Sequence, residues 1–198
     1  MQSTRPTGTP ATPPAEGPPV RLRPVERADL AWLARMETDP AAVGPHNWSG
    51  ARDAVVRLAQ LSRRYAADRF DAATDGRLVV DVGGVGPIGD VSWRTVQWGP
   101  SAESACYSIG IALLPEHRGR GYGTEAQRLL VRRLFGHSRV ARIQADTALD
   151  NVAEQRALAK VGFVREGVVR AAEWRDGRLH DHALYSVVRD EWNEVETL

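Results

Sequence analysis

The segment with the clearest chemical potential is a turn of glycine and arginine, Arg118-Gly119-Arg120-Gly121-Tyr122-Gly123. It joins an alternating apolar stretch that ends near Leu114 to a helical pattern that begins at Gly121. Glycines let a backbone approach a ligand closely, and the first amides of a helix lack internal partners. Because arginines add charged, forked donors, this turn is typical of a phosphate-binding site.

Three alternatives compete with this interpretation. A plain glycine-rich connection would need no ligand at all. A nucleotide P-loop requires a Gly-Lys-Ser/Thr ending, and the segment contains no lysine. A dinucleotide fingerprint requires the spacing G-x-G-x-x-G almost directly after a strand, but the glycines fall at 119, 121 and 123, and residues 115–118 intervene. Spacing therefore argues against both nucleotide motifs.

The elements around the turn follow from apolar periodicity, which predicts strand, two helices, three strands, helix, strand, helix and two strands. The first helix is expected to open at Asp29 and to end at Pro40, and Asp176-Gly177 marks a hairpin. The second helix has its apolar positions at Val55, Val56, Leu58, Ala59 and Leu61. Strands are expected at 20–25, 78–82, 88–96, 106–114, 141–147, 164–174 and 179–188, with later helices at 121–135 and 152–160. This mixture predicts a mixed sheet covered by helices.

Composition indicates one compact domain over residues 20–198, because 42% of the 198 residues are hydrophobic. Residues 1–19 are rich in Pro, Thr and Gly and are expected to form a disordered tail. A net charge of +1 disfavours a general nucleic-acid binder. The single cysteine, Cys106, allows no intrachain disulfide and no cysteine-based metal site, and no apolar run approaches the roughly 20 residues of a membrane span. We expect a cytoplasmic protein without a metal.

Two motifs carry a resemblance to a known family. Arg118-x-x-Gly121-x-Gly123 resembles the acyl-CoA pyrophosphate motif of the Gcn5-related N-acetyltransferases (GNAT), and residues 151–163 are similar to that family's second motif. The opening Arg21-Leu22-Arg23-Pro24 and the closing Trp174-Arg175-Asp176-Gly177 are similar to the RimJ/RimL-like branch of ribosomal-protein N-terminal acetyltransferases. The likeness spans about residues 20–190. It implies an α/β (α+β) fold with a mostly antiparallel sheet of about six to seven strands.

The resemblance also implies acetyl-CoA as co-substrate and assigns roles to residues. The pyrophosphate would bind Arg118, Gly119, Arg120, Gly121, Tyr122, Gly123 and Thr124. The pantetheine amides would pair with Ile111, Ala112 and Leu113 like an added strand. Asn151 would contact the pantetheine arm or polarise a nearby group. Gly162 and Phe163 have a simpler interpretation, as a helix C-cap and a core residue.

The acid and the base of an acyl transfer are harder to identify. Many family members carry tyrosine where this chain has Leu158. One branch carries serine three residues after the asparagine, where this chain has Glu154. Water or a tyrosine from elsewhere would then supply the acid. Glu103 is the first candidate for the base and Asp90 the second, each against the alternative of a solvated charge. His180 and His182 could titrate near neutrality or be structural, and Cys106 is expected to be packed.

The acceptor would be a primary amine, in a pocket that we expect to include Trp48, Trp93 and Trp174, although buried core is the commoner fate of tryptophan. A peptide N-terminus, an aminoglycoside-like antibiotic, a polyamine and a small amino compound all remain candidates. An acyl-CoA-binding module with little or no turnover is the alternative function, and an RNA-gripping arginine turn is a third. The resemblance adds the expectation of a homodimer.

Overall fold

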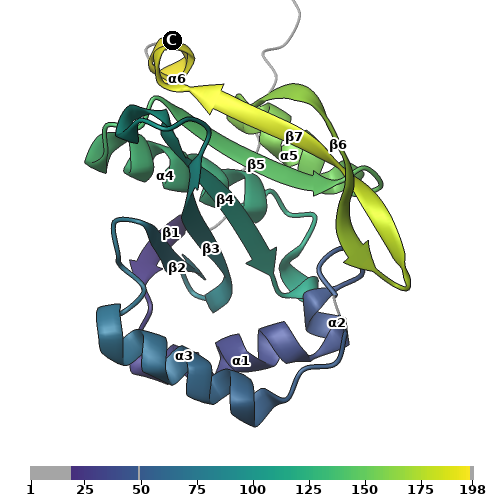
Figure 1. Cartoon of the computed structure of the whole chain (residues 1–198). Coiled ribbons are helices and arrows are strands. Elements are labelled where there is room, and N and C mark those ends of the chain that lie inside the picture. The colour runs from purple at the N-terminus through teal and green to yellow at the C-terminus, as the bar shows by residue number, and fades with distance from the viewer. Residues whose placement is uncertain (1–18, 49, 197–198) are drawn as a thin grey trace, which may run out of the picture.

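The computed structural model describes residues 19–48 and 50–196 and has seven strands in one sheet (Figure 1). The expected disordered tail, 1–19, lies outside the described residues except for its last residue. The strands are β1 (Val20–Pro24), β2 (Asp75–Val82), β3 (Gly86–Gln97), β4 (Ala105–Leu113), β5 (Arg142–Ala148), β6 (Val164–Arg175) and β7 (Arg178–Val188). The helices are α1 (Leu30–Thr38), α2 (Pro40–Val43), α3 (Ala54–Asp68), α4 (Tyr122–His137), α5 (Val152–Val161) and α6 (Arg189–Glu196). The predicted fold class and the order of the seven strands are confirmed, but the structure adds the short helix α2 and the C-terminal helix α6 to the predicted order.

The sheet has the order β1-β2-β3-β4-β5-β7-β6, and every neighbouring pair is antiparallel except β4 and β5. The parallel pair meets at only two positions, Tyr107 with Ile143 and Ser108 with Gln144. Within the described residues, the second half of β4 therefore has no strand on its β5 side. Backbone groups there remain available to a ligand, because a strand edge presents unpaired amides and carbonyls.

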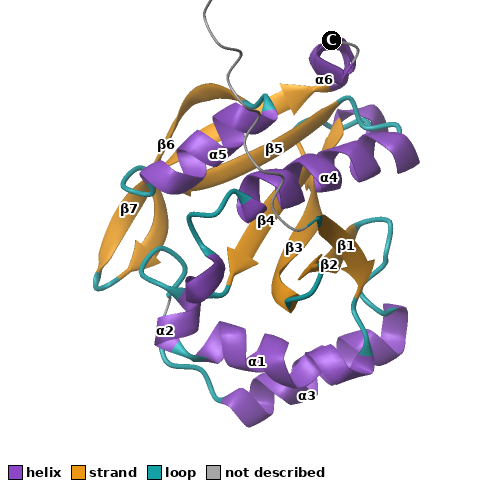
Figure 2. Cartoon of the chain, turned by 180° about the vertical axis from the view of Figure 1, so that it is seen from behind, coloured by secondary structure: helices purple, strands orange, loops and turns teal. Residues whose placement is uncertain are grey.

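Helices cover both faces of the sheet. The helices α4 and α5 lie against one face (Figure 2), where residues such as Leu130 and Leu158 are fully buried in the larger core. The helices α1 and α3 pack on the other face through a smaller core that includes Leu33, Leu61 and Val79. Within the described residues, no helix is long and apolar enough to cross a membrane.

Three local predictions need correction. Pro40 begins α2 instead of simply ending the preceding helix, because the ring fits a first helical turn and Asp39 Oδ1 accepts from the amide of Ala41 at 2.9 Å. The apolar pattern of α3 does not mark its buried face: Val55 and Val56 are 77% and 55% exposed, while Leu61 is 2% exposed. The helix α6 was not predicted, since Arg, Asp, Glu and Asn dominate its sequence.

Candidate active site

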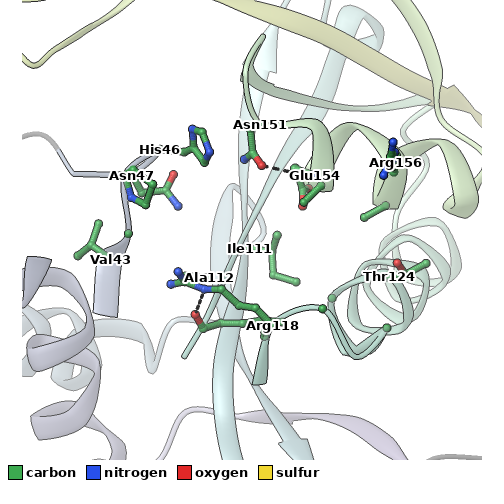
Figure 3. A pocket seen from close by; sticks show the side chains of 18 of the residues that line it. Val43, His46, Asn47, Ile111, Ala112, Arg118, Thr124, Asn151, Glu154 and Arg156 are labelled. Carbon is green, nitrogen blue, oxygen red and sulfur yellow. Dashed lines mark hydrogen bonds between the residues drawn. The ribbon is translucent and has the colours of Figure 1, made fainter. Parts of the chain in front are cut away.

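A cleft of about 360 Å³ opens along the unpaired half of β4. Four segments form its walls: the end of α2 with the loop after it, the end of β4, the glycine turn leading into α4, and one face of α5 (Figure 3). The lining residues are Val43, Gly44, Pro45, His46, Asn47, Ile111, Ala112, Leu113, Arg118, Gly119, Gly121, Gly123, Thr124, Asn151, Ala153, Glu154, Arg156, Ala157 and Lys160. The two segments singled out by their sequence motifs thus meet in one cleft.

The glycine turn presents unpartnered amides to this cleft. A 3-10 turn at Pro115–His117 follows β4, and α4 makes its first backbone bond from Glu125 to the carbonyl of Gly121 at 3.1 Å. No acceptor among the described residues bonds the amides of residues 119–124. Gly119 and Gly121 adopt φ of 73° and 84°, a conformation that L side chains rarely adopt. Amides held in this way at a helix N-terminus form a seat for an anion.

Arg118 contributes less directly than its charge suggests. Its Nε donates to the carbonyl of Leu113 at 2.9 Å, and its Nη2 donates to the carbonyl of Ala42. The guanidinium therefore ties the turn to α2, and partial burial lowers its pKa. Arg120 and Tyr122, which were expected to contact the pyrophosphate, do not line the cleft. The seat for an anion is thus built mainly from main-chain amides.

Asn151 faces the cleft from the start of α5 while capping that helix. Its Oδ1 accepts from the amide of Glu154 at 3.3 Å, and its Nδ2 donates to Thr147 Oγ1 at 3.0 Å. This cap fixes the first turn of α5 against the cleft. Further along the same helix, Arg156 and Lys160 add two cations to the wall. The spacing of three to four residues between the lining positions of α5 explains why they share one face.

Glu154 is a residue of the cleft to which sequence reasoning gave no role. Its carboxylate is largely buried, and burial raises its pKa to about 7, against a smaller opposing effect of the Gln127 side chain. Gln127 is 1% exposed, and its Nε2 lies 3.5 Å from Glu154 Oε2 and 3.2 Å from the carbonyl of Gly123. The signal was present in the sequence, because position 154 is one helical turn from Asn151 and must share its face.

The two candidate bases lie away from the cleft. Glu103 belongs to the turn Ala102–Ser104 before β4 and lines a different hollow with Trp98 and Arg142. The length of β4 from Ala105 to Ile111 separates it from the cleft by about 20 Å. Asp90 pairs in register with Ala112, but the residue is 6% exposed and its carboxylate lies 3.3 Å from the Nε of Arg77, a half-buried arginine. The position of neither residue supports a role as base.

The three tryptophans do not line the cleft either. Trp93 is 6% exposed in the larger core, where a Cβ on Gly76 would lie 2.1 Å from its ring, so its position does not support contact with an acceptor. Trp48 is half-buried and follows Asn47, the last lining residue of its loop. Trp174 is 65% exposed near the tip of the β6–β7 hairpin. Neither Trp48 nor Trp174 therefore forms part of the cleft wall.

The hairpin reaches the cleft through Arg175, the neighbour of Trp174. The side chain of Arg175 is 2% exposed and donates from Nη1 to the carbonyl of His46, a lining residue, at 2.8 Å. It also lies 3.4 Å from Glu173, which in turn lies 3.3 Å from His182. His180 contacts the same arginine at 3.2 Å. Both histidines thus belong to a network that holds the hairpin against the loop 43–47, and neither lines the cleft.

Cys106 is 2% exposed, and its Sγ lies 3.6 Å from Gln144 Oε1. The prediction of a packed side chain is confirmed, and burial raises the pKa of the thiol.

Known proteins with similar sequences are acetyltransferases of one family. Residues 20–164 match the family model of the acetyltransferase (GNAT) domain. The chain is 36% identical over 81 residues to the uncharacterized N-acetyltransferase YoaA of Bacillus subtilis (strain 168), covering 41% of this chain and 46% of YoaA. It is 27% identical over 177 residues to the uncharacterized N-acetyltransferase p20 of Bacillus licheniformis, covering 86% of this chain and 93% of p20. The chain thus spans about half the length of YoaA but most of p20.

Two solved structures share the fold. Spermidine N-acetyltransferase from Vibrio cholerae, in complex with CoA and spermine, superposes with a TM-score of 0.74 at 19% identity and covers 88% of this chain and 98% of that chain. RimJ of Mycobacterium smegmatis, in complex with CoA-disulfide, superposes with a TM-score of 0.73 at 24% identity and covers 87% of this chain and 83% of that chain.

Proposed function

The chain belongs to the GNAT family of acetyltransferases, and on that premise we propose that it is an acyl-CoA-dependent N-acyltransferase that transfers an acetyl group from acetyl-CoA to a primary amine. The carrying observation is the row of unpartnered amides at 119–124, which continues into the unpaired half of β4. A diphosphate and an amide-containing arm fit these two features in that order. The amine attacks directly while both substrates are bound.

The residues of the cleft suit the co-substrate. The amides of 119–124 would hold the diphosphate, with the cations of Arg156 and Lys160 on the facing wall. The backbone of Ile111 to Leu113 would pair with the pantetheine amides as an added strand. When bound, acetyl-CoA supplies an activated acetyl thioester.

The chain's own groups would favour the transfer in two ways. A free amine is required for attack, so water or a nearby acceptor must take its proton. A backbone amide of the 111–113 segment would donate to the oxygen that becomes negatively charged, which is the kind of preorganised donor that stabilises acyl transfer. Because this amide belongs to a strand held by β3 along its other edge, it needs little reorganisation.

The loop 43–47 lines the cleft, and Arg175 joins the β6–β7 hairpin to this loop, so we place the acceptor on this side. We propose that Trp48 and Trp174, which lie on these two segments, contact the acceptor. A peptide N-terminus, as in the RimJ/RimL-like branch, and a small amino compound or antibiotic are the acceptor classes. The similar structures include a complex with spermine and an aminoglycoside acetyltransferase, AAC(6')-Ib, in complex with coenzyme A. The proposal includes a cytoplasmic location and a homodimer.

A binding module with little or no turnover is the second candidate. Leu158, at the position where many family members carry tyrosine, is fully buried and offers no proton. Tight CoA binding without product would then be the whole function.

Two measurements test the proposal. Acetyl-CoA mixed with a panel of peptides, aminoglycosides, polyamines and amino acids should release free thiol with at least one amine; thiol release from none of them, with CoA still bound, would favour the binding module. Gly121→Asp should weaken CoA binding, measured by calorimetry, at least about 100-fold, since a carboxylate about 4 Å from a phosphate costs about 4 kcal/mol near a protein surface.

The matched control is Gly84→Asp. Gly84 has a φ of 76°, close to the 84° of Gly121, and at both positions the space that a Cβ would occupy is open. Gly84 lies in the β2–β3 turn, outside the cleft, so the variant should bear the same backbone strain and keep its CoA affinity. Equal affinity of the two variants would refute the assignment of the turn.

A further inference from the structure

The cleft contains a half-buried carboxyl group, that of Glu154, which the proposed binding of acetyl-CoA does not require. Breaking the thioester leaves an electron pair on sulfur, and a nearby acid that supplies a proton lowers the barrier. Leu158 cannot supply one. Among the described residues that line the cleft, only His46, Glu154 and Lys160 have titratable side chains other than arginine.

We propose that Glu154 is the proton donor to the departing CoA sulfur, an inference that rests on the proposed function. The side chain projects from the first turn of α5, next to Asn151, toward the part of the cleft where Ile111 lies (Figure 3). That part is the unpaired half of β4, which would carry the acyl end of the pantetheine arm.

Hydrogen bonding leaves one carboxyl oxygen free for this task. Oε2 of Glu154 accepts from Gln127 Nε2 at 3.5 Å, and Gln127 is itself held by the carbonyl of Gly123. Oε1 has no hydrogen-bond partner among the described residues. The amide of Glu154 is held by Asn151 at 3.3 Å, so the backbone of this turn is fixed as well. A proton on Oε1 would therefore face the cleft from an oriented side chain.

The surroundings also keep the proton on Glu154 near neutral pH. From α4 the facing group is the neutral Gln127; the cations of the cleft are Arg118, Arg156 and Lys160, and His46 lies on the loop across it. Within the described residues, none of these cations forms an ion pair with Glu154. Burial raises the pKa of the carboxyl to about 7. A bound co-substrate would exclude more water and favour the neutral acid further.

The other two candidates are placed less well. Lys160 lies six residues further along α5, about 9 Å from Glu154 at the rise of a helix. His46 lies on the loop after α2, with its Nδ1 3.4 Å from Asp150 and its carbonyl bonded by Arg175. Of these three residues, Glu154 lies nearest in the chain to Asn151, at the start of the helix that borders the cleft.

The step balances as follows. The amine nitrogen forms a bond to the carbonyl carbon, and the C–S bond breaks with its electron pair on sulfur. The Glu154 O–H proton passes to sulfur, giving the CoA thiol and a carboxylate. The extra proton on the new amide nitrogen passes to water, and Glu154 regains a proton from solvent as the products leave. The sum is amine plus acetyl-CoA giving N-acetyl amine plus CoA.

The test is Glu154→Gln, which keeps size and shape but holds no transferable acid proton. With an amine found in the thiol-release panel, we expect kcat to fall about 100-fold or more, as for removal of a general acid. CoA affinity by calorimetry should stay within about threefold. In the wild type kcat should decline at a pH above 7, because bound CoA favours the neutral acid further, and this decline should be absent from the variant. Glu125→Gln, a carboxyl on α4 outside the cleft that pairs with Arg128, is the matched control and should behave as wild type.

A second measurement does not depend on turnover. In protein with ¹³C-labelled glutamate carboxyls, the resonance that disappears in Glu154→Gln should titrate near pH 7 and at higher pH once CoA is bound. Titration near pH 4.5 in both states would overturn the inference. If Glu154→Gln does not fold, Glu154→Asp should keep the decline above pH 7 and at least about a tenth of kcat; loss of the decline in that variant would overturn it.

The outcomes separate this inference from the proposed function. A wild-type protein that releases no thiol refutes both. A wild-type protein that releases thiol, together with Glu154→Gln at unchanged kcat, refutes only the role of Glu154. Loss of CoA affinity in step with kcat would make Glu154 a binding residue and overturn its assignment as proton donor.

Discussion

Glu154 should make the folded protein less stable as pH rises, and Glu154→Gln should remove that effect. The carboxyl has a pKa of about 7 when folded and the ordinary 4.5 when unfolded. Below pH 4.5 both states hold the proton and the residue has no effect. Between the two values the folded state keeps a proton that the unfolded state has released, so the free energy of unfolding declines with pH. The decline is complete above about pH 7.

The magnitude follows from the two pKa values. Each pH unit between them contributes about 1.4 kcal/mol, which sets an upper bound of about 3.5 kcal/mol for the whole interval. The mouth of the cleft admits some water, so we expect about 2–3 kcal/mol. This corresponds to a difference in melting temperature of roughly 5–10 °C for a chain of this size.

The assay is urea unfolding of wild type and Glu154→Gln at pH 5 and pH 8. The variant should gain about 2–3 kcal/mol on the wild type between the two pH values. Other carboxylates, such as Glu37 and Glu166, whose pKa values are lowered by arginine partners, shift both proteins equally and cancel in the difference. Glu125→Gln should show no such gain. A stability difference between wild type and Glu154→Gln that does not change with pH would show that the carboxyl is not desolvated.

Two further predictions concern the walls of the cleft. Arg175→Met should lower the free energy of unfolding by about 2–3 kcal/mol, because a charged hydrogen bond to the His46 carbonyl and a contact with Glu173 are lost from a buried site. Arg178→Met, on the exposed end of the same hairpin, should change the free energy of unfolding by less than about 0.5 kcal/mol. Equal melting temperatures of the two variants would contradict a stabilising bond between Arg175 and the loop 43–47. Lys160 is the chain's single lysine and lines the cleft, so CoA at tenfold its Kd should slow its modification by an amine-acylating reagent about tenfold, followed by peptide mass analysis; unchanged labelling would place the bound CoA elsewhere.

The sequence predicted those parts of the protein that depend on local geometry. The glycine turn is local, since positive φ, a preceding strand and a helix start lie within a few residues, and seven strands follow from period and turn signals. The role of the α5 face in the cleft was harder to predict from the sequence, because the environment of Glu154 depends on Gln127 of α4, which packs beside it.

The structure does not support those expectations that took nearness along the chain as nearness in space. Glu103 precedes the strand that borders the cleft, yet the strand carries it about 20 Å from the relevant end. Trp93 occupies an alternating position whose inward or outward direction depends on the helices above the sheet. The exposed valines of α3 look like a buried stripe, but only the neighbouring α1 decides which side of the helix is covered.

The two-residue contact between β4 and β5 has a mechanical consequence. It divides the sheet into a four-stranded lobe and a three-stranded lobe, joined at a narrow hinge and bridged on one side by α4 and α5. A ligand that bonds to the free edge of β4 lies between the two lobes and fixes their separation. When such a ligand is bound, hydrogen exchange should therefore slow most at the amides of 109–113 and least in the outer strands, β1 and β6.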